Sequence, residues 1–287
     1  MIEGDYMSRY DSYKKKAMEL LQSSRMKLFA VILTLNFISM LNSMLSSFYS
    51  GNDNFKIVSF LITVVLIAAN LYVHMLFLQL TRTKTLRFRA LRLNGAQILA
   101  MFLVAIILGL GNVALLFVVA LALQWIPSLY AVGVFFVSLL VMMVEAIAAF
   151  AISDGYRGIF KICLSSIRFV RSFAKEMLQA AGVYILVYLT LMVVTNLLTA
   201  QFLEILKPSS EELNAIMASG SVMYHALQYE KTLMIGYALL GVQAVQLVVN
   251  SYLYAYIYTF YALLYEDAKD NFFLIEEAPS LQKRKKK

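Results

Sequence analysis

Cysteine and histidine are scarce in this chain, and each scarcity excludes a kind of site. The single cysteine, Cys163, leaves no disulfide framework and no cysteine-based metal site. The two histidines, His74 and His225, exclude a histidine-rich metal site, and no zinc-protease, phosphate-loop or nucleophile-elbow motif occurs. We therefore expect a protein that is not an enzyme, with no catalytic residues, no metal and no cofactor.

Charged residues are also scarce, at 15% of the chain, whereas a soluble domain has about 25%. Hydrophobic residues make up 61% of the 287 residues and the mean hydropathy is +0.73. No soluble fold of this length buries so much apolar surface. The composition predicts an all-α, polytopic membrane protein.

Long apolar runs fix the expected spans, because a helix needs about 20 apolar residues to cross a bilayer. Proline is rare, and its three occurrences lie outside or at the edges of these runs, where a missing N–H does no harm. The sequence predicts six transmembrane helices in three hairpins, at about 28–49, 57–80, 98–124, 126–152, 177–203 and 233–264.

Positive charge alternates along the chain with these spans. The N-terminus, the second and fourth connections and the C-terminal tail hold 22 of the 25 Lys and Arg residues. Since cytoplasmic segments retain Lys and Arg, we expect a cell-membrane protein with both termini in the cytoplasm. The net charge of +8 then indicates contact with anionic headgroups and not with nucleic acid.

Three parts of the chain follow from this topology. Residues 1–27 form a cytoplasmic, amphipathic N-terminal segment, residues 28–264 form the six-helix membrane domain, and residues 265–287 form a cytoplasmic basic tail.

The last span is rich in tyrosine, in "NSYLYAYIYTFYALLYEDAKD" at 250–270. A lone strand cannot satisfy its backbone in lipid, so this stretch is expected to be a helix. At 100° per residue, Tyr254, Tyr258, Tyr261 and Tyr265 share one face. The hydroxyls either bond within the bundle and the interfacial belt or line a ligand or lipid site.

Two ionisable residues fall inside spans, Glu145 in "VMMVEAIAAF" and His74 in "NLYVHMLFLQL". Intramembrane ionisable groups are costly and by default suggest a function. With Tyr254, Tyr258 and Tyr261 they form a candidate polar site, as a proton relay or counter-ion pair. The alternative is an interhelical hydrogen bond or a neutral, desolvated carboxyl.

The connection "YRGIFKICLSSIRFVRSFAKE", residues 156–176, has an amphipathic helical pattern. The pattern is typical of an interfacial helix that contacts anionic lipid, and docking of a membrane-protein partner or an ATPase is the alternative. The basic residues that share its polar face are Arg157, Lys161, Arg168, Arg171 and Lys175.

The opening "SYKKKAMELLQSSRMKLF", the central "AISDGYRGIFKICLSSIRFVRS" and the final "SYLYAYIYTFYALLYE" together resemble a family of uncharacterised six-helix membrane proteins of Gram-positive bacteria. That family is related to the membrane domain of some glycerophosphodiester phosphodiesterases. Its Asp after a long span is matched by Asp154, and its Ser by Ser165 or Ser166. The resemblance implies six helices in the cytoplasmic membrane and no catalytic residues.

A second, looser resemblance is to the coupling loop of ABC-type permeases. "EAIAAFAISDGYRGIFKICL" is similar to its E-A-A…D-G…F…I-x-L run, although Ser165 stands where that motif ends in Pro. Two functions follow. The first is a non-enzymatic accessory or assembly factor in envelope processes or export, and the second is a transporter or permease subunit for a small or amphiphilic substrate.

Overall fold

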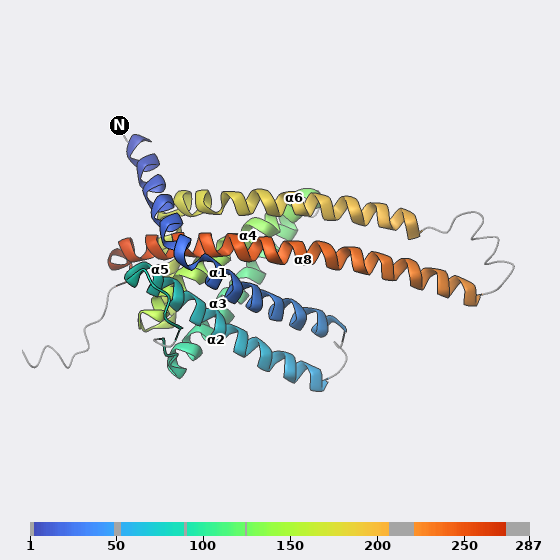
Figure 1. The fold of residues 1–287 in the computed structure, drawn as a ribbon, viewed down its shortest axis with the longest axis horizontal. Helices are drawn as coiled ribbons and strands as arrows, with labels where there is room; N and C mark the ends of the chain where they lie inside the picture. Colours follow the sequence, from blue (N-terminus) through green and yellow to red (C-terminus); the bar gives the residue numbers. More distant parts are fainter. Residues whose placement is uncertain (1–2, 49–52, 89–90, 124, 207–220, 274–287) are drawn as a thin grey trace, which may run out of the picture. The chain divides into compact units, whose positions relative to one another are not determined.

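The computed structural model describes residues 3–48, 53–88, 91–123, 125–206 and 221–273. Within these ranges the chain forms α-helices and no strand, which confirms the all-α prediction (Figure 1). The elements in order are α1 (Glu3–Phe48), α2 (Asp53–Thr83), α3 (Gly95–Leu123), α4 (Pro127–Ser153), α5 (Ile159–Ser172), α6 (Ala174–Leu206), α8 (Ser221–Ala268) and a 3-10 turn, η2 (Lys269–Asn271).

Five of these helices are long and apolar enough to cross a membrane. Their candidate spans are Tyr10–Ser46, Asn54–Thr83, Gly95–Leu123, Val132–Ser153 and Leu240–Asn271. A multi-pass, membrane-embedded protein follows from this. The segment predicted at 177–203 lies in α6, a helix of 33 residues, but it is not among the five, so six spans remain a prediction.

The chain divides into two compact units. The first contains the described residues of Met1–Ala180 and Tyr254–Lys287, and the second is Ala181–Leu253. The first unit holds α1 to α5, the start of α6 and the tyrosine-rich end of α8, and it contains every candidate residue discussed below. The basic run at 281–287 lies outside the described residues.

α1 runs without a break through the predicted boundary at residue 27. Tyr13, Ala17 and Leu21 are buried, whereas Lys14, Lys15 and Lys16 between them are exposed. The Tyr13 ring packs edge-on against Phe260 of α8 at 5.9 Å, and the Tyr13 hydroxyl donates a hydrogen bond to Asp267. The N-terminal helix is thereby attached to the end of α8.

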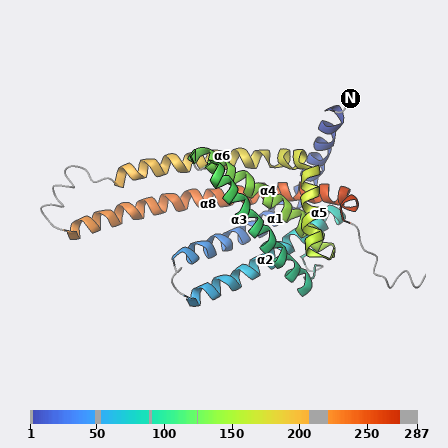
Figure 2. The same cartoon turned by 180° about the vertical axis from the view of Figure 1, so that it is seen from behind.

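The turn between α4 and α5 depends on two glycines. Gly155 and Gly158 have φ angles of 83° and 90°, in the left-handed region that glycine adopts without steric cost. Gly158 is also the residue from which α5 begins. The chain therefore changes direction after Ser153, and α5 lies crosswise to the end of α8 that belongs to the same unit (Figure 2).

α3 and α4 pack along one another, and they are in tight contact at Gly133. A Cβ atom added to Gly133 would lie 2.8 Å from Cγ1 of Val119 and 3.1 Å from Cδ1 of Leu123. By contrast, a Cβ atom at Gly109 in α3 would meet nothing within 4 Å. The two helices approach closely because residue 133 has no side chain.

Gly133→Ala is expected to destabilise the α3–α4 pair, and Gly109→Ala provides a matched control. Both changes bring a helix-propensity gain of about 1 kcal/mol, but only Gly133→Ala overfills a packed contact, at a cost of about 1–3 kcal/mol. Thermal unfolding in detergent should therefore give a lower melting temperature for Gly133→Ala than for Gly109→Ala. Equal melting temperatures would contradict the close contact.

Candidate functional site

Three helix ends meet in the first unit and bring four charged side chains together. Arg82 lies in the last turn of α2, Asp154 is the C-cap residue of α4, and Glu266 lies in the last turn of α8 with Lys269 just beyond it. All four are at the point where an apolar helix ends. There a long side chain can extend toward its counterion while its helix stays in the apolar layer.

These four side chains form a closed network of alternating sign. Arg82 donates from Nη2 to Oδ1 of Asp154 at 2.5 Å, and from Nε to Oε1 of Glu266 at 2.8 Å. Lys269 donates from Nζ to Oδ2 of Asp154 at 3.2 Å and to Oε2 of Glu266 at 3.1 Å. Each cation contacts both carboxylates, so the network is electrically balanced. We call it the charged tetrad.

Aromatic side chains surround the tetrad. The Tyr265 hydroxyl donates to Oδ2 of Asp154 at 3.3 Å, and its ring packs against Phe150, Phe169 and Phe273 at 5.6, 6.2 and 5.7 Å. The Asp154 side chain is only 9% exposed, whereas that of Arg82 is 42% exposed. Charge-assisted hydrogen bonds gain strength in such a low-dielectric setting, so the Asp154 half of the tetrad contributes most to joining the helices.

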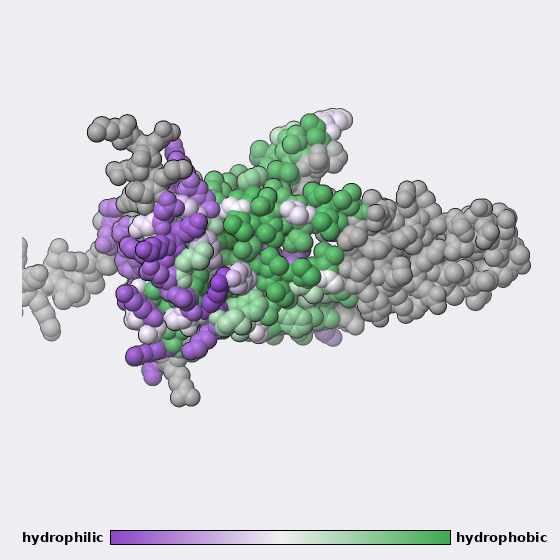
Figure 3. Space-filling view, turned by 45° about the horizontal axis from the view of Figure 1, so that its top comes forward, coloured by the Kyte–Doolittle hydropathy of each residue, from purple (hydrophilic) through white to green (hydrophobic). Residues whose placement is uncertain are grey.

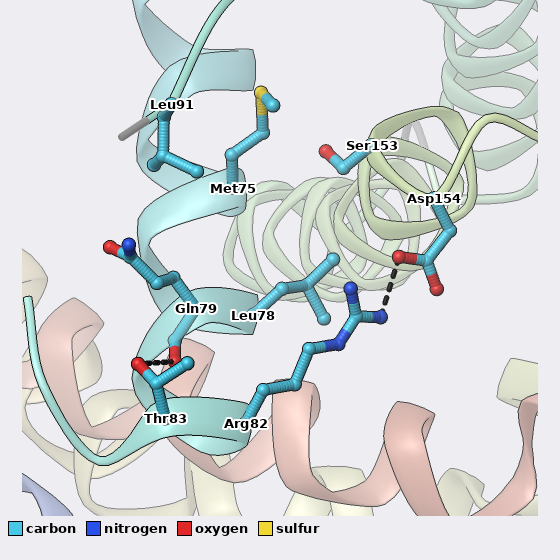
Figure 4. Close-up of a pocket in the computed structure, with 8 residues that line it drawn as sticks. All are labelled: Met75, Leu78, Gln79, Arg82, Thr83, Leu91, Ser153 and Asp154. Atoms are coloured by element: carbon cyan, nitrogen blue, oxygen red, sulfur yellow. Dashed lines mark hydrogen bonds and ion pairs between the residues drawn. The ribbon is translucent and has the colours of Figure 1, made fainter. Parts of the chain in front are cut away.

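A pocket of about 170 Å³ lies beside the tetrad. Figure 4 shows Arg82 extending from α2 to Asp154 at the end of α4, with Ser153 next to it. The rest of the lining is Met75, Leu78, Gln79, Thr83 and Leu91. Because the guanidinium of Arg82 already contacts two carboxylates, the pocket offers no unbalanced charge to an ion.

Side chains of α2 hold the α2–α3 connection beside this pocket by hydrogen bonds to its backbone. The amide of Gln79 accepts from the backbone N–H of Arg87 at 3.0 Å and donates to the Arg87 carbonyl at 3.4 Å. Tyr72 donates to the carbonyl of Phe88 at 2.6 Å. On the other side, Gln97 of α3 donates to the carbonyl of Ile152 at 3.1 Å, which also accepts from the backbone N–H of Gly155 at 3.0 Å.

His74 is fully packed in the first unit. Nδ1 lies 2.8 Å from the carbonyl oxygen of Asn70, so this nitrogen carries the proton and Nε2 has the lone pair. Nε2 has no hydrogen-bond partner in the part of the chain that the structure describes. The ring packs edge-on between Phe150 and Tyr258, at 5.2 and 5.0 Å.

The tyrosine stripe lies on α8, as the helical prediction required. Tyr258 packs against Tyr254 at 5.6 Å and against Tyr261 at 6.5 Å, so the structure brings His74 and the three predicted tyrosines together. The buried Tyr261 hydroxyl donates to the carbonyl of Met177 in α6 at 3.2 Å. At least this hydroxyl and that of Tyr265 bond inside the protein.

Glu145 of α4 is half-buried. Among the described residues, no hydrogen bond or ion pair joins it to His74. His74 lies on α2 and Glu145 lies on α4, and these two helices pack against each other. Their pairing as a relay therefore has no contact to support it and stays a hypothesis.

The basic residues predicted to share one face lie on and around α5, since Arg157 precedes the helix and Lys175 belongs to α6. Ile162, Cys163, Ser166, Phe169 and Val170 form the buried side of the helix. The predicted headgroup-contacting residues are all exposed: Arg157, Lys161, Arg168, Arg171 and Lys175. The amphipathic pattern is present in α5, but this helix is shorter than the predicted 156–176, since it ends at Ser172 and α6 begins at Ala174. Contact with lipid stays a prediction.

Comparisons of the chain with protein-family models, with curated proteins and with solved structures found no match. The resemblance to the Gram-positive membrane family therefore remains a prediction. Within the described ranges, no group of three or more His, Cys, Asp or Glu side chains is placed to hold a metal ion.

Sequence reasoning missed three members of the charged tetrad and found Asp154 only through a family resemblance. In the sequence, Arg82 enters only the charge count, and Glu266 falls in a tail whose composition is basic. One local signal was available, because Glu266 and Lys269 are three residues apart on a helix, a spacing that favours an ion pair. Their long-range partners on α2 and α4 had no such signal.

A double-mutant cycle tests the tetrad. Arg82→Gln and Glu266→Gln should each destabilise the protein, and the double variant should lose less than the sum of the two. Since Arg82 is partly exposed and solvent screens it, we expect a coupling energy of about 1 kcal/mol, measured by denaturant titration in mixed micelles.

The control for this cycle is Asp270→Asn, because Asp270 is exposed at the same end of the chain. It should change the free energy of unfolding by less than about 0.5 kcal/mol. Strictly additive effects of Arg82→Gln and Glu266→Gln would show that the pair does not join α2 to α8.

Proposed function

We propose that this protein is a non-enzymatic multi-pass membrane protein that acts as an accessory or assembly factor in envelope processes or export. The five long apolar helices support the assignment to multi-pass membrane proteins. The accessory role is supported by how the first unit is filled, which resembles a rigid support more than a passage for a substrate.

The observation that carries the proposal is the close aromatic packing of this interior. The largest fully buried side chains include Phe77, Phe150, Phe169 and Phe260, together with Tyr261 and Tyr265. Both tyrosine hydroxyls have acceptors in the protein, at the Met177 carbonyl and at Asp154. A transport path would need polar groups facing water along its length, whereas these polar groups are used to join helices.

The proposal includes six spans in three hairpins, with both termini in the cytoplasm of a cell membrane. Supporting it, the exposed cations of the first unit are concentrated in the start of α1, the α2–α3 connection and α5. Figure 3 shows hydrophilic side chains gathered at one end of this unit, next to a hydrophobic surface. Segregation of this kind is typical of the cytoplasmic boundary of a membrane protein.

A transporter is the second candidate, and one observation favours it. Nε2 of His74 is buried without a partner among the described residues, and an unpaired polar atom in the apolar layer is costly. A proton or a substrate donor that visits this nitrogen would account for it. Glu145 would be the other ionisable group in such a path.

The orientation can be tested by cysteine labelling in intact cells with a membrane-impermeant maleimide. In a Cys163→Ser background, Asn54→Cys should react from outside, whereas Arg92→Cys and Ser172→Cys should react only after permeabilisation. All three wild-type residues are exposed, so access depends on the membrane alone. Reaction of residue 92 or 172 in intact cells would overturn the orientation.

The two functions differ in their response to neutral substitutions of the ionisable residues. In cells that lack the protein, the Glu145→Gln and His74→Gln variants should restore cell growth under envelope stress as well as the wild type does. An accessory factor needs only the packed helices and no ionisable group at these positions. Asp154→Asn is the matched control and should restore it poorly, since it breaks the tetrad. Failure of Glu145→Gln or His74→Gln, with normal protein level and melting temperature, would favour the transporter.

A further inference from the structure

α5 has a second apolar surface, separate from the side that packs into the protein. Phe160 is 79% exposed, Leu164 is 50% exposed and Ile167 is 48% exposed. Spaced by four and three residues, they lie on one stripe of the helix. We call this set the outer stripe.

The outer stripe has cations along one edge. At 100° per residue, Arg171 falls on the stripe and Arg168 lies next to it, and Arg157 precedes the helix by two residues; all three are exposed. α5 contains no acidic residue. The exposed part of the helix therefore joins an apolar strip to a cationic edge.

The apolar side that the sequence marks on this helix cannot make an external contact, because the protein already covers it. Phe169 is fully buried and packs against Phe272 and Phe173, at 5.2 and 4.9 Å. Ile162 and Val170 are buried as well. Any external apolar contact of α5 must be made by the outer stripe.

We infer that α5 is seated in the interface of an anionic bilayer, with Phe160, Leu164 and Ile167 among the acyl chains and Arg157, Arg168 and Arg171 at the lipid phosphates. The inference rests on the membrane location in the proposed function and is independent of the accessory role.

The position of α5 in the fold favours a bilayer as the occupant. α4 ends at Ser153 and α6 begins at Ala174, so the helix is tied at both ends close to an apolar helix. It also lies crosswise to the end of α8 that belongs to the same unit (Figure 2). A helix held in this way at the end of the spans has its exposed arc beside the headgroups, where apolar and basic residues on adjoining strips bind best.

Charge complementarity selects the type of lipid. Arg168 and Arg171 on a helix without a carboxylate, with Arg157 just before it, attract an anionic surface and gain nothing from a neutral one. A soluble partner such as an ATPase would instead need to cover Phe160 and Leu164 with its own apolar groups. These two residues fall in the stretch that is similar to a permease coupling loop, so a protein partner is the outcome that the experiment must separate.

The test is spin labelling of the full chain in lipid vesicles. Cys163 is buried, and burial raises the pKa of its thiol, so it reacts slowly, and Cys163→Ser removes it as a background. Single cysteines at Leu164, Ile167, Ser172 and Val113 then carry the label. Collision with oxygen reports hydrocarbon, and collision with a water-soluble nickel chelate reports the aqueous phase.

In vesicles of phosphatidylglycerol and phosphatidylcholine, labels at 164 and 167 should collide with nickel several-fold less often than the label at 172. In pure phosphatidylcholine, or at molar salt, which screens the arginines, this difference should shrink. Equal nickel access at 164, 167 and 172 would overturn the inference. Burial at 164 and 167 only in native membranes that contain other proteins would overturn it in favour of a protein partner.

Two comparisons keep the result interpretable. Val113 lies on α3 and is 66% exposed, so its label should be deep in hydrocarbon if the protein spans the membrane. If the label at 113 is shielded from nickel and those at 164 and 167 are accessible to it, only the inference about α5 is contradicted. If the label at 113 is also accessible to nickel, the proposed membrane location is contradicted. A triple variant, Arg157→Gln, Arg168→Gln and Arg171→Gln, should remove the response to phosphatidylglycerol, and an unchanged response would contradict the role of the arginines.

Discussion

The balanced contact of Arg82 and Lys269 with two carboxylates is the interaction on which the first unit depends. Apolar helices in a bilayer have little to specify their register, because lipid solvates their side chains as well as a neighbouring helix does. A network of fixed charges at the helix ends supplies that specificity. It sets the ends of α2, α4 and α8 against one another, and the aromatic shell around Tyr265 shields its Asp154 half from water.

The position of α5 follows from the same junction. Asp154 caps α4 and belongs to the tetrad, and Gly155 and Gly158 turn the chain immediately after it. Beyond α8, Phe272 packs against Phe169 of α5, and Phe273 packs against Tyr265, whose hydroxyl contacts the tetrad. This packing buries one side of α5, so only the opposite side of the helix is exposed.

Prediction succeeded where local chemistry decides the structure. The tyrosine-rich stretch had to be a helix because lipid offers no partner to an open backbone, and α8 is one. The amphipathic pattern within residues 156–176 was readable because apolar residues recur at the period of a helix, and α5 buries one side of it. Prediction failed at the tetrad. In the sequence, Arg82 at a helix end only indicates orientation, and its contacts with Asp154 and Glu266 are visible only in the folded structure.

By itself, the sequence determined that this is an all-helical membrane protein, because apolar length and the need of the backbone for internal hydrogen bonds leave no other solution. Only the tertiary structure decided which polar groups are spent on holding helices together and which surface stays open. Phe160 and Phe169 are both phenylalanines on α5, yet one is exposed and the other is buried. The difference arises from packing against residues about a hundred positions away, which periodicity within one helix does not encode.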